Sequence, residues 1–171
     1  MKKDNDPNFL DLAKVFSGEV PSFSFSLPVP GEEEAGGMAL SDFAIEGKAV
    51  NVSGFLRISG TASCTLSAPC GRCLAPVQVR HTVPFDRPVV KTASDDESED
   101  AVLCEGEKID PALLCLDTVL PELPLRLLCR EDCKGLCPRC GKDRNAGPCG
   151  CPEKEVDPRL AGLAGFFESE K

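Results

Sequence analysis

The clearest pattern in the chain is an alternation of apolar and polar residues between positions 50 and 70. Asn, Ser, Thr and Arg fill most of the odd positions, and Phe55 is the exception. A period of two residues is typical of an antiparallel strand with one buried and one wet face. The run is too long for one ordinary strand, so we expect it to divide near Gly60, with Gly54 and Gly60 marking a turn or bulge. The apolar set is Val50, Val52, Leu56, Ile58, Ala62, Cys64, Leu66, Ala68 and Cys70.

Two further segments alternate in the same way. Residues 22–27 place Phe23, Phe25 and Leu27 on one side of an expected strand, and residues 30–37 follow as a loop rich in Gly and Glu. The next alternating segment covers residues 76–90 and predicts a partner for the strand that ends near position 70. Its inward set is Val77, Val79, His81, Val83, Phe85 and Val89. The motif Cys70-Gly-Arg-Cys73 therefore lies at the tip of a predicted hairpin.

One main helix is predicted after these strands. Asp110 is a good N-cap and Pro111 suits the first helical position, so the helix begins there and runs to about Leu120. Pro121 and Pro124 end it. The residues at helical spacing are Leu113, Leu114, Asp117 and Leu120. Shorter amphipathic helices are expected after Asp6-Pro7 and after Asp157-Pro158.

Length and patterning together predict an α+β fold in one domain that covers residues 1–171. The expected parts are an antiparallel sheet, one main helix and a cysteine-rich C-terminal segment at 129–151. Residues 1–18 form an N-terminal arm. Residues 92–107 contain five Asp and Glu close together and are expected to be a flexible, solvated loop.

Charge is distributed unevenly along the chain. The formal net charge is −9, which argues against coating nucleic acid by bulk charge. Residues 121–151 nevertheless contain six Lys or Arg against four Asp or Glu, so this segment is the expected place for any contact with phosphate. The six basic residues are Arg126, Arg130, Lys134, Arg139, Lys142 and Arg144.

The eleven cysteines are not expected to form disulfides. Their number is odd, eight of them fall in tight groups, and residues 1–18 lack the apolar run of a signal peptide. Without a signal peptide we expect a cytoplasmic protein, and a reducing cytosol keeps thiols free. The chain also lacks an apolar stretch of about 18 residues, so no membrane span is expected.

The strongest chemical signal is Cys137-Pro-Arg-Cys140-Gly, followed eight residues later by Cys149-Gly-Cys151. Two thiolates separated by two residues can reach one ion, and the glycine permits the tight turn. Soft sulfur ligands favour zinc among common cytosolic metals. These four cysteines therefore predict a zinc site.

Four more cysteines form two pairs, Cys70 with Cys73 and Cys129 with Cys133. A second tetrahedral site built from both pairs would attach the hairpin tip to the tail. In a competing arrangement, Cys70 and Cys73 share one ion with Cys137 and Cys140 and the other cysteines stay free. Sequence spacing leaves both arrangements open.

The remaining cysteines, Cys64, Cys104 and Cys115, are isolated and are expected in the core as small hydrophobes. His81 is the single histidine, and its inward position favours a satisfied buried side chain over a ligand or base. No acid is placed near it in sequence and no phosphate-binding glycine loop is present, so we expect no enzyme and no small-molecule substrate. Cys70 and Cys73 have the spacing of a thiol redox motif, but a strand rather than a helix is expected after them, which makes redox chemistry the lesser hypothesis.

The cysteine-rich segment carries a family resemblance. Cys133-Lys-Gly-Leu-Cys137-Pro-Arg-Cys140-Gly, the later Cys149-Gly-Cys151 and the earlier Cys70-Gly-Arg-Cys73-Leu-Ala-Pro-Val, in this order, resemble the cysteine-rich, zinc-binding branch of the YceD family. The resemblance covers roughly residues 50–163. It implies a bacterial, cytoplasmic, non-enzymatic factor that promotes the synthesis, processing or stability of 23S rRNA in large-subunit biogenesis.

The expected partners are rRNA or pre-50S ribosomal particles, bound directly or through a protein. In this hypothesis zinc orders the tail, and the six basic residues at 126–144 meet rRNA phosphates or an acidic protein. The alternatives are a zinc-dependent protein-interaction module, the redox protein described above, or charges that only solvate the metal site.

Overall fold

The computed structural model describes residues 9–91, 100–104 and 106–152, which fold into an α+β structure as the sequence predicts. A six-stranded sheet has the order β2-β4-β5-β6-β7, with β3 beside β4. Its neighbours pair antiparallel, except for β6 with β7. The strands are β2 (Ser22–Val29), β3 (Glu33–Ala35), β4 (Met38–Val52), β5 (Phe55–Pro69), β6 (Pro76–Val90) and β7 (Val102–Leu103).

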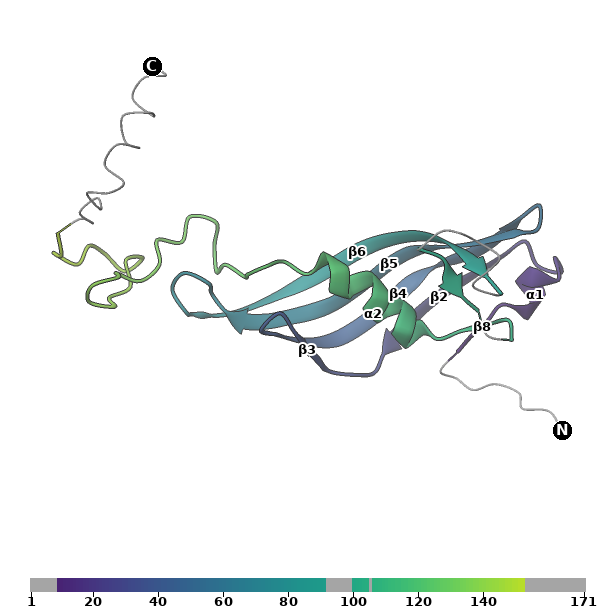
Figure 1. Cartoon of the computed structure of the whole chain (residues 1–171), viewed down its shortest axis with the longest axis horizontal. Coiled ribbons are helices and arrows are strands. Elements are labelled where there is room, and N and C mark those ends of the chain that lie inside the picture. Colours follow the sequence, from purple (N-terminus) through teal and green to yellow (C-terminus); the bar gives the residue numbers. More distant parts are fainter. Residues whose placement is uncertain (1–8, 92–99, 105, 153–171) are drawn as a thin grey trace, which may run out of the picture.

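Smaller elements lie around this sheet. β1 (Leu10–Asp11) pairs with β8 (Lys108–Ile109), and α1 (Ala13–Phe16) follows β1. The main helix is α2 (Pro111–Val119), continued by a 3-10 turn at Leu120–Glu122. α2 lies across one face of the sheet, α1 lies at one end, and the cysteine-rich segment extends from the opposite end, beside the tip of the β5–β6 hairpin (Figure 1).

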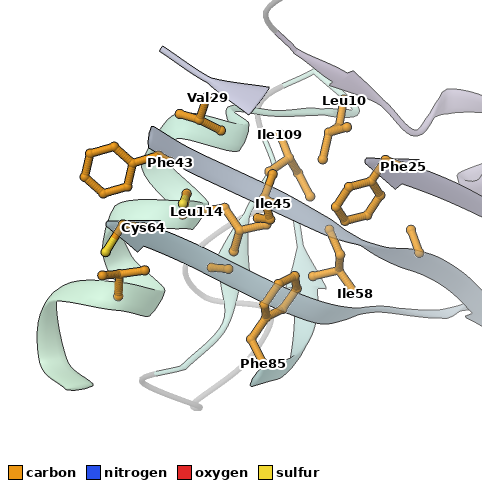
Figure 2. Close-up of a cluster of buried hydrophobic side chains, with 14 of the residues drawn as sticks. Leu10, Phe25, Val29, Phe43, Ile45, Ile58, Cys64, Phe85, Ile109 and Leu114 are labelled. Atoms are coloured by element: carbon orange, nitrogen blue, oxygen red, sulfur yellow. The ribbon is translucent and has the colours of Figure 1, made fainter. Parts of the chain in front are cut away.

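The core lies between α2 and the covered face of the sheet. Ile45 of β4 lies beside Leu114 of α2 and Ile109, and Ile58 of β5 belongs to the same buried cluster, nearer to Phe85 (Figure 2). The predicted N-cap is confirmed, since the Asp110 carboxylate accepts the Ala112 amide at 2.8 Å. The prediction of the apolar face of the helix is partly wrong. Leu113 is exposed, and the buried face is shifted by about one residue toward the C-terminus. The buried positions include Leu114, Cys115, Thr118 and Val119.

The long alternating run turns at Gly54, which is one of the two predicted positions, and does not turn at Gly60. β4 ends at Val52, Ser53 and Gly54 take positive φ values of 55° and 92°, and β5 then continues through Gly60 without a break. The division near Gly60 is therefore wrong. Val52 pairs with Phe55, and both side chains are exposed, so the inward placement of Val52 is also wrong.

Gly60 has a different function from the one expected. It pairs with Gly47 of β4, and a Cβ atom on Gly60 would lie 2.6 Å from the Gly47 Cα and closer still to the Glu46 carbonyl oxygen. The two glycines thus let β4 and β5 approach closely where the sheet bends over the core, instead of ending a strand.

β4 was not expected as a continuous strand, and residues 30–37 were expected to be a loop. Within those residues β3 pairs with β4 around a turn at Gly36 and Gly37. A register shift between Ser41 and Ala44, with Asp42 at φ 51°, marks a bulge. The buried positions change there from even numbers (Met38, Leu40) to odd ones (Phe43, Ile45, Ala49), which hides the period of two.

β6 has the predicted bounds, but its inward face is buried at one end only. Val83, Phe85 and Val89 are buried, whereas Val79 is exposed and His81 is half-buried. α2 has nine residues, about 14 Å of helix, and a 15-residue strand spans about 50 Å, so the helix cannot cover the half of β6 nearer the hairpin tip. The expectation of a satisfied histidine is wrong, since His81 Nε2 has no hydrogen-bond partner among the described residues.

The N-terminal helix expected after Asp6-Pro7 is shorter than predicted, since residues 10–11 form a strand and α1 starts at Ala13. Residues 1–8 and the helix expected after Asp157-Pro158 lie outside the described residues. The predicted loop at 92–107 contains β7, because Val102 and Leu103 extend the sheet beside β6. Residues 92–99 of that loop lie outside the described residues. Cys64, Cys104 and Cys115 are buried, as expected.

The close approach at Gly60 leads to a first prediction. Gly60→Ala should lower the free energy of unfolding by about 1–3 kcal/mol, because the methyl group forces β4 and β5 apart. Urea unfolding followed by circular dichroism measures this. Ser59→Ala on the neighbouring position adds no atom and should change stability by less. Equal stability of the two variants would contradict the steric argument.

Candidate metal centres

The structure brings eight of the eleven cysteines into two groups of four. Within each group all four Sγ atoms lie within 4.8 Å of one another. The hairpin group joins Cys70 and Cys73 at the β5–β6 tip to Cys129 and Cys133 in the tail. The tail group joins Cys137 and Cys140 to Cys149 and Cys151. The competing arrangement, in which Cys70 and Cys73 lie with Cys137 and Cys140, is not the one that forms.

The sulfur separations suit a tetrahedral ion. Cys70 and Cys133 lie 3.9 Å apart, and Cys73 and Cys129 lie 3.6 Å apart, Sγ to Sγ. Four sulfurs at about 2.3 Å from a zinc ion are separated from each other by about 3.8 Å. The donor set therefore fits a soft, four-coordinate metal ion.

The two CxxC turns have the same backbone structure. In the hairpin turn the Cys70 amide donates to the Ala75 carbonyl at 2.7 Å, and the Leu74 amide donates to the Cys70 carbonyl at 3.0 Å. In the tail turn the Cys137 amide donates to Lys142 and the Gly141 amide to Cys137, both at 2.9 Å. Leu74 and Gly141 have φ values of 62° and 71°. The tail turn thus has the glycine that this backbone favours, and the hairpin turn holds a leucine there.

Backbone amides stabilise one thiolate in each turn. Hydrogen bonds from the amides of Cys73, Arg72 and Cys129 lower the pKa of Cys70 to about 6. The amides of Cys140 and Arg139 likewise lower the pKa of Cys137 to about 6. Amides placed around the first sulfur of a turn favour its anionic form, which is the form that binds metals.

One thiol in each group has a raised pKa instead of a lowered one. Sharing a proton with Cys133 raises the pKa of Cys129 to about 12, and sharing with Cys140 raises that of Cys151 to about 12. Four thiolates this close repel one another, so the fully ionised group needs a cation at its centre. Metal binding would release those protons.

Hydrogen bonds attach the tail to the hairpin tip. The Arg72 guanidinium donates to the carbonyls of Glu131 and Cys133 at 3.0 and 2.9 Å, and the Arg72 carbonyl accepts the Leu136 amide. The Gly71 amide donates to Leu127 at 2.9 Å. Arg72 was not singled out from the sequence, although its place between two ligand cysteines was a signal that it would lie at the junction.

The six basic residues predicted to contact a partner are all exposed. Arg126 packs over Gly71 at the hairpin tip. Arg139 and Arg144 line a groove of about 540 Å³ beside Cys137, Cys149 and Cys151. Arg130 is 3.4 Å from the Asp132 carboxylate, and Lys142 donates to the Pro148 carbonyl at 3.0 Å. The basic residues therefore lie near the cysteine groups, with their side chains exposed.

Within the described residues no helix is long and apolar enough to cross a membrane. All eleven cysteines are free thiols.

The fold and the site define an α+β protein with two four-cysteine groups that join a sheet hairpin to a C-terminal tail. The chain belongs to the family described as large ribosomal RNA subunit accumulation protein YceD, whose match covers residues 58–167. The family resemblance seen in the sequence is thereby confirmed.

Similar curated proteins are found in several bacteria. An uncharacterized protein of Mycobacterium tuberculosis is 36% identical over 70% of this chain and 59% of its own length. One of Mycobacterium leprae is 36% identical over 66% of this chain and 54% of its own. The uncharacterized protein YlbN of Bacillus subtilis is 29% identical over 77% of each. This chain thus spans somewhat more than half the length of the mycobacterial relatives. No solved structure matches it.

The buried cysteines outside the groups lead to a second prediction. Burial raises the pKa of Cys115 to about 11 and also raises that of Cys64 and Cys104, so these thiols stay protonated near neutral pH. Iodoacetamide applied to the native, chelator-treated protein should modify the two groups and spare these three. Peptide mass spectrometry identifies the modified sites, and complete reaction in denaturant is the control. Labelling of Cys115 as fast as Cys140 would contradict the assignment.

Proposed function

We propose that this protein is a non-enzymatic factor that promotes the synthesis, processing or stability of 23S rRNA, and that two zinc ions order its tail. The observation that carries the proposal is the convergence of eight cysteine sulfurs into two groups of tetrahedral size. The family description supports the connection to large-subunit rRNA.

Zinc is the ion that best suits this chemistry. Thiolates are soft ligands, and four-cysteine sets are typical of structural zinc sites. A closed set of four sulfurs leaves no coordination position for a substrate or an activated water, which favours a structural over a catalytic function. The ions would supply order to a segment that has little apolar core of its own.

The charge distribution supports rRNA or a pre-50S particle as the partner in the cytoplasm. The six exposed basic residues at 126–144 lie among or beside the cysteines of both groups, while the chain outside residues 121–151 carries a net charge of −11. Phosphate contacts made by such a surface depend on salt, since each neutralised phosphate releases counterions. The acidic body would restrict binding to the tail and hairpin tip.

A protein-interaction module is the second candidate, and specific exposed side chains favour it. Leu125 is fully exposed and Leu74 is 64% exposed, and both flank the junction between the hairpin tip and the tail. Leu74 also lies in the left-handed region, which is unfavourable for a leucine. A ribosomal or processing protein that covers these leucines would account for their exposure.

The zinc hypothesis predicts the metal content of the protein. Protein purified under reducing conditions without chelator should contain two zinc ions per chain by elemental analysis. Cys140→Ser with Cys149→Ser should reduce this to one, since only the tail group is lost. Cys104→Ala, outside both groups, should still bind two. A wild-type protein with no stoichiometric metal would contradict the zinc hypothesis.

The partner hypothesis predicts association in cells. Crosslinked RNA recovered with Arg139→Glu/Lys142→Glu should fall several-fold relative to wild type, because the tail loses attraction for phosphate. Lys48→Glu/Arg57→Glu reverses two exposed charges on the sheet and should leave crosslinking unchanged. Equal crosslinking by the tail variant and wild type would refute the basic surface. Association with pre-50S particles that survives nuclease would instead support the protein-interaction module.

A further inference from the structure

One asparagine connects the two cysteine groups. Asn145 lies in the loop between Cys140 and Cys149, which are both members of the tail group. Its side-chain amide nevertheless donates to Cys133 Sγ, in the hairpin group, at 3.4 Å. A residue that belongs to one group by sequence therefore contacts a sulfur of the other.

Every polar atom of the Asn145 side chain is engaged. Its Oδ1 accepts the Lys134 amide and the Arg130 guanidinium, each at 2.8 Å. Its Nδ2 also donates to the Asp143 carboxylate at 2.7 Å, and its backbone amide donates to the same oxygen at 2.8 Å. These bonds fix the orientation of the side-chain amide, so its N–H group points at the sulfur in a single arrangement.

Backbone contacts fix the position of the whole loop against the hairpin group. The Arg144 amide donates to the Gly135 carbonyl at 2.9 Å, and Leu136 and Asp143 form a bridge. Gly135 in turn packs against Arg72 of the hairpin tip. Cysteines of the tail group also stand at both ends of the loop that carries Asn145, so an ion that holds those sulfurs together would restrain the loop further.

We infer that Asn145 is a positioning residue that couples the metal affinities of the two cysteine groups, which rests on the proposed metal binding. When an ion holds the tail group together, the loop is ordered and the amide is presented to Cys133. The N–H···S bond then stabilises the thiolate as a ligand in the hairpin group. When the tail group is open, the loop loses this anchor and the hairpin group loses its donor.

The coupling has a defined size and direction. Loss of a hydrogen-bond partner of a metal ligand typically costs about 10–100-fold in affinity. Because binding linkage is reciprocal, an ion in the hairpin group must raise the affinity of the tail group by the same factor. We therefore expect the two sites to load cooperatively, with about a tenfold coupling.

Asn145→Asp provides a test, since it keeps acceptor oxygens for Lys134 and Arg130 and removes the N–H groups that donate to Cys133 and Asp143. It also adds a negative charge there, so Asn145→Ala is measured beside it. Zinc affinity of the full chain is measured by competition with a chromophoric chelator. The variant should bind at the hairpin group about tenfold more weakly than wild type. Gln78→Glu makes the same amide-to-acid change on exposed β6 near the hairpin tip, where the side chain donates to Ser67 rather than to a sulfur, and should bind as wild type does.

The same variant is then measured with the tail group disabled by Cys140→Ser and Cys149→Ser. In that background the effect of Asn145→Asp should disappear, because the loop no longer presents the amide. Equal losses in both backgrounds would overturn the coupling. Independent binding of two ions by wild type would also overturn it, while leaving the proposed function intact. Absence of any bound zinc in wild type would overturn both.

A spectroscopic measurement separates coupling from loss of structure. In cadmium-substituted protein, the 113Cd resonance of the hairpin group reports on hydrogen bonding at its sulfurs. It should shift when the tail group is filled in wild type and stay in place in Asn145→Ala. A shift of the same size in Asn145→Ala would contradict the assignment, even if that variant were less stable.

Discussion

The hydrogen-bonded junction between the β5–β6 hairpin tip and the cysteine-rich tail is the constraint on which the site depends. Beyond Leu127 the buried residues of the described tail are Cys133, Gly135 and Cys137, so no apolar cluster holds this segment together. Arg72 and Gly71 instead bind its backbone directly. These contacts fix Cys129 and Cys133 opposite Cys70 and Cys73 and give the hairpin group its shape.

Local signals in the sequence were strong enough to predict part of this arrangement. The CxxC spacings identified the ligand pairs, and the two turns share one backbone structure, as their similar sequences require. The Asp110-Pro111 cap located α2, and the alternation in β6, which Arg87 interrupts, gave its bounds. In each case the information lies within a few neighbouring residues.

The features that escaped prediction depend on contacts between distant residues. The bulge at Asp42 reverses the phase of alternation in β4, and its bent backbone is stabilised by Arg80, which donates to the Asp42 carbonyl. Gly60 resembles a strand breaker until its cross-strand partner Gly47 is known. The partition of eight cysteines between two groups depends likewise on the register of the tail against the hairpin, which spacing alone leaves open.

The apolar core and the exposed basic side chains of the cysteine-rich tail lie in different parts of the molecule. The sheet and α2 supply an apolar core, and the net negative charge lies outside residues 121–151. The tail has little core but carries exposed basic side chains on a framework of turns and sulfurs. Changes in the tail can therefore alter what the protein contacts without disturbing the packing that keeps the sheet folded.

The hairpin group also has a topological consequence. Cys73 and Cys129 are 56 residues apart, and the segment between them contains β6, β7, β8 and α2. An ion shared by these sulfurs would close that segment into a ring and remove conformational entropy from the unfolded chain, much as a disulfide does. Unlike a disulfide, such a cross-link persists in a reducing compartment, and it would restrain one edge of the sheet together with the helix that covers it.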